Sequence, residues 1–121
     1  MECIFCKIIN GEITSYTIYE DEIVKAFLDV NPDSNGHTLI IPNKHYLDLY
    51  EIPNDVLMHC LEVAKKLGRV YEEKLGVDGI TLVQNNGNVQ EVKHFHLHVK
   101  PQYNNKSDII SVQDVYKKIT N

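Results

Sequence analysis

Residues 94–99 read His-Phe-His-Leu-His-Val, and this stretch determines how the rest of the chain is interpreted. Polar and apolar residues alternate with the two-residue period of a β-strand, so the pattern predicts a strand with three histidines on one face. Neighbours on one face of a strand lie ~7 Å apart. Imidazoles at that spacing can bind the oxygens of a phosphate, share a metal ion, or divide a nucleophile and an acid between them. The alternative is a solvated polar face, and three histidines in register among six in the chain argue against it.

The composition of the chain is that of an ordinary small globular protein. It has 121 residues, of which 43% are hydrophobic and 24% charged, so we expect one domain over residues 1–121. The formal net charge of −5 leaves no basic face for a nucleic-acid backbone, so we expect no nucleic-acid partner, although one small anion can still bind. An odd number of cysteines argues against a disulfide framework. No apolar run has the length of a membrane span, and the first residues contain no basic signal region, so we expect a cytoplasmic protein with no membrane partner.

Hydrophobic periodicity predicts the other helices and strands. A short helix is expected at residues 3–9, a long amphipathic helix from Pro53 to Gly76, and a short terminal helix after Ser111. Strands are expected at residues 17–20, 23–28, 37–42, 79–84 and 94–99, with Pro42 and Pro101 ending the third and the fifth. This order of elements indicates an α+β fold, a mostly antiparallel sheet that carries its helices on one face.

Three residues of the long helix have a structural interpretation. Cys60 lies on the apolar stripe and is expected in the core, whereas His59 is expected on the solvated surface. Gly68 costs roughly 1 kcal/mol relative to alanine within a helix, so we expect it to mark a close contact with the sheet.

Cys3 and Cys6 form a Cys-x-x-Cys pair near the start of the chain. Two thiolates one helical turn apart can occupy adjacent corners of a tetrahedral zinc site, and two further ligands must then come from elsewhere. His45 follows the third expected strand and is available, because it has no place in the histidine row. A pair of buried thiols is the alternative, and a thioredoxin-like redox pair lacks the βαβ unit that it needs.

Together these residues resemble the histidine triad (HIT) superfamily, specifically its branch of small homodimeric nucleoside phosphoramidate hydrolases. The resemblance implies an antiparallel five-stranded sheet with one long and one or two short helices. It also implies a homodimer. In it, the long helix and the strand at residues 79–84 pair with their copies in the partner across a two-fold axis, which makes one continuous sheet. Besides the triad, the matching residues are Ile4-Phe5-Cys6-Lys7-Ile8-Ile9, Asp29, Gly36-His37, Ile41-Pro42, Asn85-Asn86-Gly87 and Gln90-Glu91-Val92-Lys93-His94.

The resemblance implies an enzyme that acts on the α-phosphate of purine nucleoside phosphoramidates or aminoacyl-adenylates. His96 would be the nucleophile and form a transient nucleotidyl-histidine, because a neutral imidazole attacks well near pH 7 and also leaves well. His98 would hydrogen-bond the phosphoryl oxygens and the leaving group. His37 and His94 would orient this pair, and no catalytic metal is required.

The same resemblance assigns residues that bind the purine nucleotide. Asp29 would hold the ribose hydroxyls, Asn85 would contact the phosphate, and Gln90 would lie beside the leaving group. The apolar residues that the resemblance places around the base suit a position in the hydrophobic core at least as well as one in the pocket wall. Those expected around the base are Ile4, Phe5, Ile8, Leu28 and Val30.

Bacterial members of the superfamily that this chain resembles contain a structural zinc ion. Carried over to this sequence, its ligands are Cys3, Cys6, His45 and His94. Four protein ligands close the site, so the zinc would join the N-terminal segment to the triad and fix the orientation of His94.

Two departures from the family's pattern keep alternatives open. The loop at residues 87–90 is short, with Val89 where glycine is common, and Glu91 stands where serine is frequent. A carboxylate at that position repels a phosphate unless it is protonated or turned away. The alternatives are a dinucleoside polyphosphate hydrolase and a non-catalytic, zinc-stabilised nucleotide-binding module.

Overall fold

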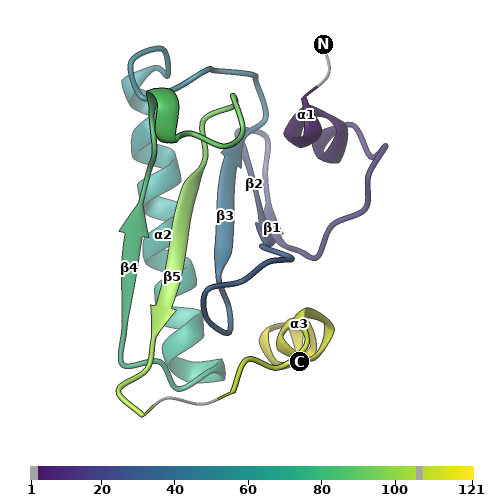
Figure 1. Cartoon of the computed structure of the whole chain (residues 1–121), viewed down its shortest axis with the longest axis vertical. Helices are drawn as coiled ribbons and strands as arrows, with labels where there is room; N and C mark the ends of the chain where they lie inside the picture. The colour runs from purple at the N-terminus through teal and green to yellow at the C-terminus, as the bar shows by residue number, and fades with distance from the viewer. Residues whose placement is uncertain (1–2, 106–107) are drawn as a thin grey trace.

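A five-stranded antiparallel sheet with the strand order β1-β2-β3-β5-β4 forms the centre of the fold (Figure 1). The structure, a computed structural model, describes residues 3–105 and 108–121, so residues 1–2 and 106–107 of the expected domain lie outside it. The expected α+β fold is confirmed. Its elements are α1 (Ile4–Ile9), β1 (Thr17–Glu20), β2 (Val24–Leu28), β3 (Thr38–Pro42), α2 (Asn54–Lys74), β4 (Gly79–Val83), the short 3₁₀ helix η1 (Gly87–Val89), β5 (Leu97–Gln102) and α3 (Val112–Thr120).

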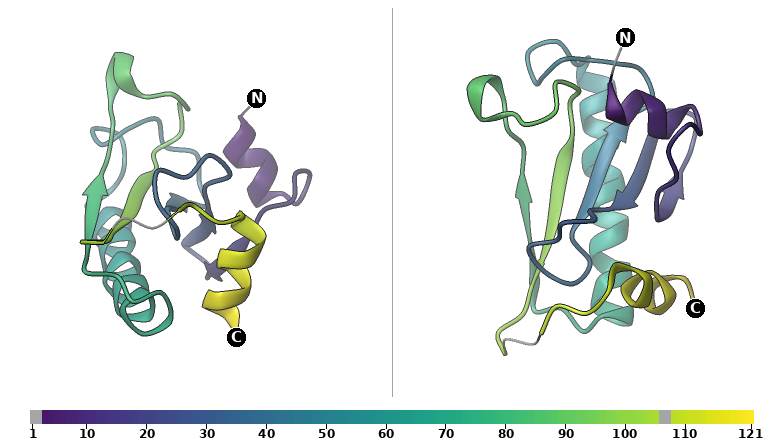
Figure 2. Two further views of the ribbon diagram at one scale, coloured as in Figure 1. Left: turned by 60° about the horizontal axis from the view of Figure 1, so that its bottom comes forward. Right: turned by 45° about the vertical axis from the view of Figure 1, so that its right-hand side comes forward.

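Helices cover both faces of the sheet (Figure 2). Alternate strand residues, such as Ala26 and Ile40, pack in one buried cluster with side chains of α2 and α3. The residues between them, such as Phe27 and Leu39, pack in a second cluster with α1. The prediction that the helices lie on one face is therefore wrong for α1, because an amphipathic pattern does not specify which face a helix covers.

The histidine segment enters the sheet later than its alternation predicts. β5 begins at Leu97, so His94 and His96 precede the strand. The pairing of β3 with β5 stops at Ile40 and Leu97, and beyond it the N–H of Phe95 donates to the carbonyl of Tyr46 at 2.7 Å. The apolar residues of the segment still share one face, as predicted. That face points toward α2, since Phe95, Leu97 and Val99 lie in its cluster.

Pro101 does not end β5, contrary to the prediction. It pairs with Ile80 of β4, and the strand continues to Gln102. On the side of β5 that faces β3, the pairing begins only at Thr38 and Val99, so no β3 residue lies opposite Pro101. Proline has no backbone N–H, and at this position β3 does not need one as a hydrogen-bond donor. The other predicted bounds agree with the structure to within one or two residues.

α2 packs along one face of the sheet as its apolar stripe predicts. Cys60 is fully buried there. A Cβ atom on Gly68 would lie 3.1 Å from Cδ1 of Ile80, so the expected close contact with the sheet is present. None of the helices within residues 3–105 and 108–121 has both the length and the apolar character needed to cross a bilayer.

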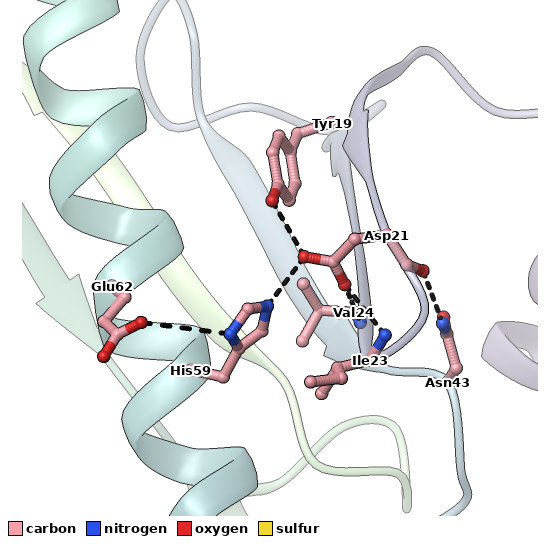
Figure 3. Close-up of polar contacts among 7 residues, drawn as sticks. All are labelled: Tyr19, Asp21, Ile23, Val24, Asn43, His59 and Glu62. Atoms are coloured by element: carbon pink, nitrogen blue, oxygen red, sulfur yellow. Dashed lines mark hydrogen bonds and ion pairs between the residues drawn. The ribbon is translucent and has the colours of Figure 1, made fainter.

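The carboxylate of Asp21 joins the β1–β2 hairpin to α2 (Figure 3). It accepts hydrogen bonds from the N–H groups of Ile23 and Val24 at 2.8 and 2.9 Å, which closes the turn. Nε2 of His59 lies 2.7 Å from the same carboxylate, and Nδ1 of that ring lies 4.0 Å from Glu62. The prediction of a solvated His59 is only partly right: the side chain is 23% exposed, and the ring also binds an aspartate 38 residues earlier.

Candidate functional site

A hollow of about 300 Å³ opens on the face of the sheet that carries the histidines. β5, the β2–β3 loop and the segment after β4 all contribute to it. A larger hollow of about 530 Å³ lies beside the first turns of α2, next to His59 and away from the histidine row. We assign the site to the smaller hollow, because most of the expected polar site residues line it. Its lining residues are Asp29, Asn31, Asp33, His37, Asn85, Glu91, His96, His98 and Lys100.

His96 faces this hollow with a free ring nitrogen. Its Nδ1 lies 2.8 Å from the carbonyl oxygen of His94, which can only accept, so Nδ1 carries the proton and Nε2 keeps its lone pair. The side chain is 4% exposed and meets the ring of Phe5 edge-on at 5.1 Å. Burial lowers the pKa of His96, so the imidazole is neutral at pH 7 and suited to nucleophilic attack.

A chain of hydrogen bonds assigns the protons of His37 and His98. The backbone N–H of Asp33 donates to Nδ1 of His37 at 3.0 Å, so the proton of His37 is on Nε2. That Nε2 lies 2.9 Å from Nδ1 of His98, which must accept. Burial, together with the neighbouring histidines and Lys100, lowers the pKa of His98 to about 4. The neutral ring of His98 therefore carries its proton on Nε2, opposite to His96.

The carboxylate of Asp29 completes a second group of potential metal ligands. An oxygen of Asp29 and ring nitrogens of His37 and His98 lie within 4.8 Å of one another. However, Nε2 of His37 is protonated while its Nδ1 accepts from Asp33, and a protonated nitrogen cannot coordinate a metal. In this hydrogen-bonded arrangement the group is a donor–acceptor network.

Cys3, Cys6, His45 and His94 form a separate cluster next to the histidine row, and their ligand atoms lie within 4.8 Å of one another. Nδ1 of His94 is 3.5 Å from Sγ of Cys3, and Nδ1 of His45 is 3.3 Å from Sγ of Cys6. Nε2 of His94 donates to the carbonyl of Pro42 at 3.0 Å, so the lone pair of Nδ1 faces the sulfurs. Ligands on a tetrahedral zinc ion, with bonds of about 2.0–2.3 Å, are separated by such distances. The four residues can therefore hold a metal ion, and their chemistry fits zinc.

The expected nucleotide-binding residues are placed differently around the hollow. Asp29 and Asn85 line it. Gln90 does not line it: the residue is buried, and its side-chain amide donates to the carbonyl of Leu47 at 2.6 Å. Val30 is 68% exposed, whereas Leu28 packs in the cluster of α2 and α3. Of the α1 residues expected around the base, Ile4 is exposed and two are buried, Phe5 and Ile8.

Two charged residues of the hollow, Lys100 and Asp33, were not predicted from the sequence. Lys100 follows His98 on the same face of β5, and its Nζ lies 2.8 Å from a carboxylate oxygen of Asp33. The two-residue period already contains the signal for Lys100, since residues 98 and 100 must share a face. Asp33 lies in an irregular loop, and no periodic pattern could have identified it.

Comparisons with known proteins agree with this fold. The sequence matches the family model of the HIT domain over residues 10–105. It is 49% identical over 115 residues to an uncharacterized HIT-like protein of Methanocaldococcus jannaschii, covering 93% of this chain and 88% of the relative. It is 41% identical over 110 residues to an adenosine 5'-monophosphoramidase of Saccharomyces cerevisiae, covering 89% and 67%. A Zn-bound histidine triad family protein from Mycobacterium smegmatis has a similar structure, with a TM-score of 0.90 and 32% identity over 98% of this chain and 91% of that chain.

Proposed function

The chain belongs to the HIT domain family, and we propose that it is a nucleotide hydrolase or transferase. Its substrates are purine nucleoside phosphoramidates or aminoacyl-adenylates, which it attacks at the α-phosphate. The observation that carries this proposal is the opposite protonation of two histidines at one hollow: His96 offers a lone pair and His98 a proton. The named activity of the yeast relative supports the substrate class.

His96 is the nucleophile of the proposed reaction. Its Nε2 forms a bond to the α-phosphorus, and the bond from phosphorus to the leaving group breaks. The departing amine of a phosphoramidate takes a proton from water, whereas the carboxylate of an aminoacyl-adenylate leaves as the anion. Positive charge develops on the ring, and the carbonyl of His94 stabilises it through Nδ1–H. Water then attacks phosphorus and loses a proton to solvent, and the electron pair of the N–P bond returns to Nε2.

Three polar groups position the nucleotide for this attack. The Nε2–H of His98 and the side-chain amide of Asn85 donate to the phosphoryl oxygens, which offsets the charge of the transition state. One carboxylate oxygen of Asp29 accepts from the N–H of Asn31 at 2.8 Å, and the other is available to a ribose hydroxyl. Glu91 is exposed at the rim, so water solvates its charge and it can turn away from the phosphate.

We also propose that Cys3, Cys6, His45 and His94 hold a structural zinc ion. Bound zinc supplies a cross-link between the start of α1, the segment after β3 and the segment before β5. The protein's own contribution is the orientation of His94, whose ring is held by the carbonyl of Pro42. The backbone carbonyl of His94 in turn orients the ring of His96, so the metal site supports the nucleophile indirectly.

A homodimer is the oligomeric state that we propose. β4 is an edge strand of the sheet, and Leu82 on it is exposed on the face that α2 covers, because it lies opposite Val99. Met58 of α2 is also exposed. Pairing of two copies along β4 and α2 buries both side chains. Sedimentation should show a dimer that Leu82→Lys converts to a monomer, and a monomeric wild-type protein would contradict the assignment.

An adenosine phosphoramidate tests the proposed reaction directly. The wild-type protein should release AMP, and mass spectrometry of acid-quenched protein should find an adenylyl group on His96. His96→Asn should abolish turnover and leave the AMP dissociation constant within about tenfold, since the variant keeps most of the contacts to the phosphate. AMP binding without product above buffer would identify a nucleotide-binding module instead. Activity on diadenosine tetraphosphate alone would identify a dinucleoside polyphosphate hydrolase.

A further inference from the structure

The ion pair between Lys100 and Asp33 lies at the hollow, and the proposed reaction gives it no role. Nζ of Lys100 is 2.8 Å from a carboxylate oxygen of Asp33. The backbone N–H of the same aspartate donates to Nδ1 of His37. We propose that Lys100 is a positioning residue that acts through Asp33 and His37 to keep the proton of His98 on Nε2.

Lys100 is placed on a rigid element and Asp33 on an irregular one. Lys100 belongs to β5, which pairs with β4 at the position of Thr81. Asp33 lies in the loop between β2 and β3, where a hydrogen bond from the N–H of His37 to the carbonyl of Ser34 sets the local turn. The side chain of Lys100 is 24% exposed and that of Asp33 63% exposed. The ion pair therefore connects the irregular β2–β3 loop to β5, the strand that carries His98.

The tie matters because Asp33 makes both contacts from one residue. If the carboxylate is held by Lys100, the neighbouring backbone N–H is held against His37. Without that N–H, the proton of His37 is free to occupy Nδ1. Nε2 of His37 then becomes an acceptor, and the 2.9 Å contact forces His98 to donate from Nδ1. The nitrogen that His98 turns toward the hollow would then carry a lone pair.

The two proton arrangements have opposite effects on a bound phosphate. With the proton on Nε2, His98 donates to a phosphoryl oxygen. With the proton on Nδ1, a nitrogen lone pair faces the same oxygen and repels it. Among the residues that line the hollow, the carboxylates of Asp29, Asp33 and Glu91 are opposed by one ammonium group, that of Lys100.

The ion pair is maintained across the ordinary pH range. The hydrogen bond from Lys100 lowers the pKa of Asp33, so the carboxylate stays charged at neutral pH and somewhat below it. The other groups that face Asp33 are His37 and His98, and burial lowers the pKa of both, so neither competes as a cation. Exposed ion pairs contribute little to folding stability, so the orientation of the Asp33 backbone is the larger consequence of this one.

Nuclear magnetic resonance of the full-length protein labelled with ¹⁵N-histidine tests the proposal without substrate. In the wild-type protein, His37 and His98 should both be protonated on Nε2 and bare on Nδ1. Lys100→Met should move His98 toward the Nδ1-protonated form, and Lys100→Arg should restore the wild-type pattern. Lys74→Met is the matched control, because that ammonium donates to the carbonyl of Asn121 at 2.7 Å and does not line the hollow. A wild-type His98 protonated on Nδ1, or an unchanged pattern in Lys100→Met, would overturn the inference.

Kinetics supply the second readout, which rests on the proposed function. Lys100→Met should lower kcat for an adenosine phosphoramidate by about tenfold and change KM by less than about threefold, since the lost donor acts mainly in the transition state. Lys100→Arg should recover most of kcat, and Lys74→Met should leave it unchanged. A tenfold increase in KM with kcat unchanged in Lys100→Met would indicate that the ammonium group only attracts the phosphate, and it would contradict the positioning role. If the wild-type protein shows no turnover, the proposed function fails, and the resonance experiment still decides the inference.

Discussion

His59 and His37 each lie close to an aspartate, yet the two regions have opposite character. Nε2 of His59 is 2.7 Å from Asp21, whose carboxylate also accepts from two backbone N–H groups and from Tyr19 (Figure 3). Nε2 of His37 is 3.6 Å from Asp29, whose carboxylate accepts one hydrogen bond from Asn31 among the described residues. The first group is saturated and joins a turn to a helix. The second leaves donors and acceptors directed at a hollow.

This difference separates a structural histidine from a functional one. A saturated carboxylate has no capacity left for a ligand, so its hydrogen bonds stabilise the fold. Near His37, the N–H of Asp33 donates to Nδ1 of His37, and Nε2 of His37 donates to Nδ1 of His98. The remaining nitrogen, Nε2 of His98, has no hydrogen-bond partner within residues 3–105 and 108–121. We therefore expect substitutions in the two regions to affect different measurements.

The largest difference is expected between His96→Asn and His59→Asn. His96→Asn should lower kcat by at least about 10³-fold, because it removes the proposed nucleophile, and leave the unfolding midpoint in urea nearly unchanged. His59→Asn should keep kcat within about twofold and lower the unfolding midpoint. Turnover assays and urea titrations on the same preparations measure both. Equal loss of kcat in the two variants would erase the distinction between the regions.

Removal of the proposed metal ligand Cys6 should have the next largest effect. Cys6→Ser replaces a thiolate by a weak ligand, and the bound zinc should fall from about one equivalent to less than about a tenth. Zinc at 1,000 times its dissociation constant stabilises the folded state by about 4 kcal/mol, and this contribution should disappear. Elemental analysis and thermal unfolding measure the two quantities.

Cys60→Ser is the matched control for that variant, because the third cysteine lies on the buried face of α2 and belongs to no metal group in the described part of the chain. It should lower stability by removing an apolar contact and retain its zinc. Wild-type protein that is purified without chelators and contains less than about a tenth of an equivalent of zinc would refute the metal assignment.

The alternation of residues 94–99 predicts which side chains share a face better than it predicts their protonation. Alternation placed His98 on the correct face, but the proton of His98 depends on a backbone N–H of Asp33, and that of His96 on a backbone carbonyl. Backbone groups are the same in every residue, so no sequence pattern reports their direction. The Cys-x-x-Cys spacing did indicate two of the four residues that can hold a metal ion, because the geometry of that pair is local.

The errors in the fold prediction have a similar origin. The start of β5 at Leu97 depends on where β3 stops pairing with it, which the periodicity of one segment does not contain. His59 and His37 differ in role because of partners that are distant in the sequence, Asp21 for the first and His98 for the second. The face covered by α1 is likewise set by the second apolar cluster, to which β2 and β3 contribute. Long-range pairing is the information that local patterns lack.

Asp21→Asn and Asp29→Asn sharpen the comparison with a smaller effect. Asp21→Asn should lower the free energy of unfolding by about 2 kcal/mol, because it removes the charge that His59 and two N–H groups share. Asp29→Asn should change stability by less than about 0.5 kcal/mol and weaken AMP binding by about tenfold, since a hydroxyl then meets a neutral acceptor. Urea unfolding and calorimetric titration with AMP measure the pair. A crossed result, with weaker AMP binding in Asp21→Asn alone, would contradict both assignments.

The smallest expected effect is the pH dependence that Asp21 contributes. Although burial opposes it, the hydrogen bonds from Val24, His59, Ile23 and Tyr19 together hold the pKa of Asp21 well below its usual range. A carboxyl group with a lowered folded-state pKa stabilises the protein above its unfolded-state pKa of about 3.9, and that contribution is lost as the pH falls toward the folded-state pKa. From pH 5 to pH 3, the wild-type protein should therefore lose about 1 kcal/mol more unfolding free energy than Asp21→Asn, in which the group does not titrate. Parallel urea titrations of the two proteins across this interval measure the difference. Parallel curves would show that the Asp21 network does not favour the charged carboxylate, and the contrast with the histidine hollow would then have to rest on geometry alone.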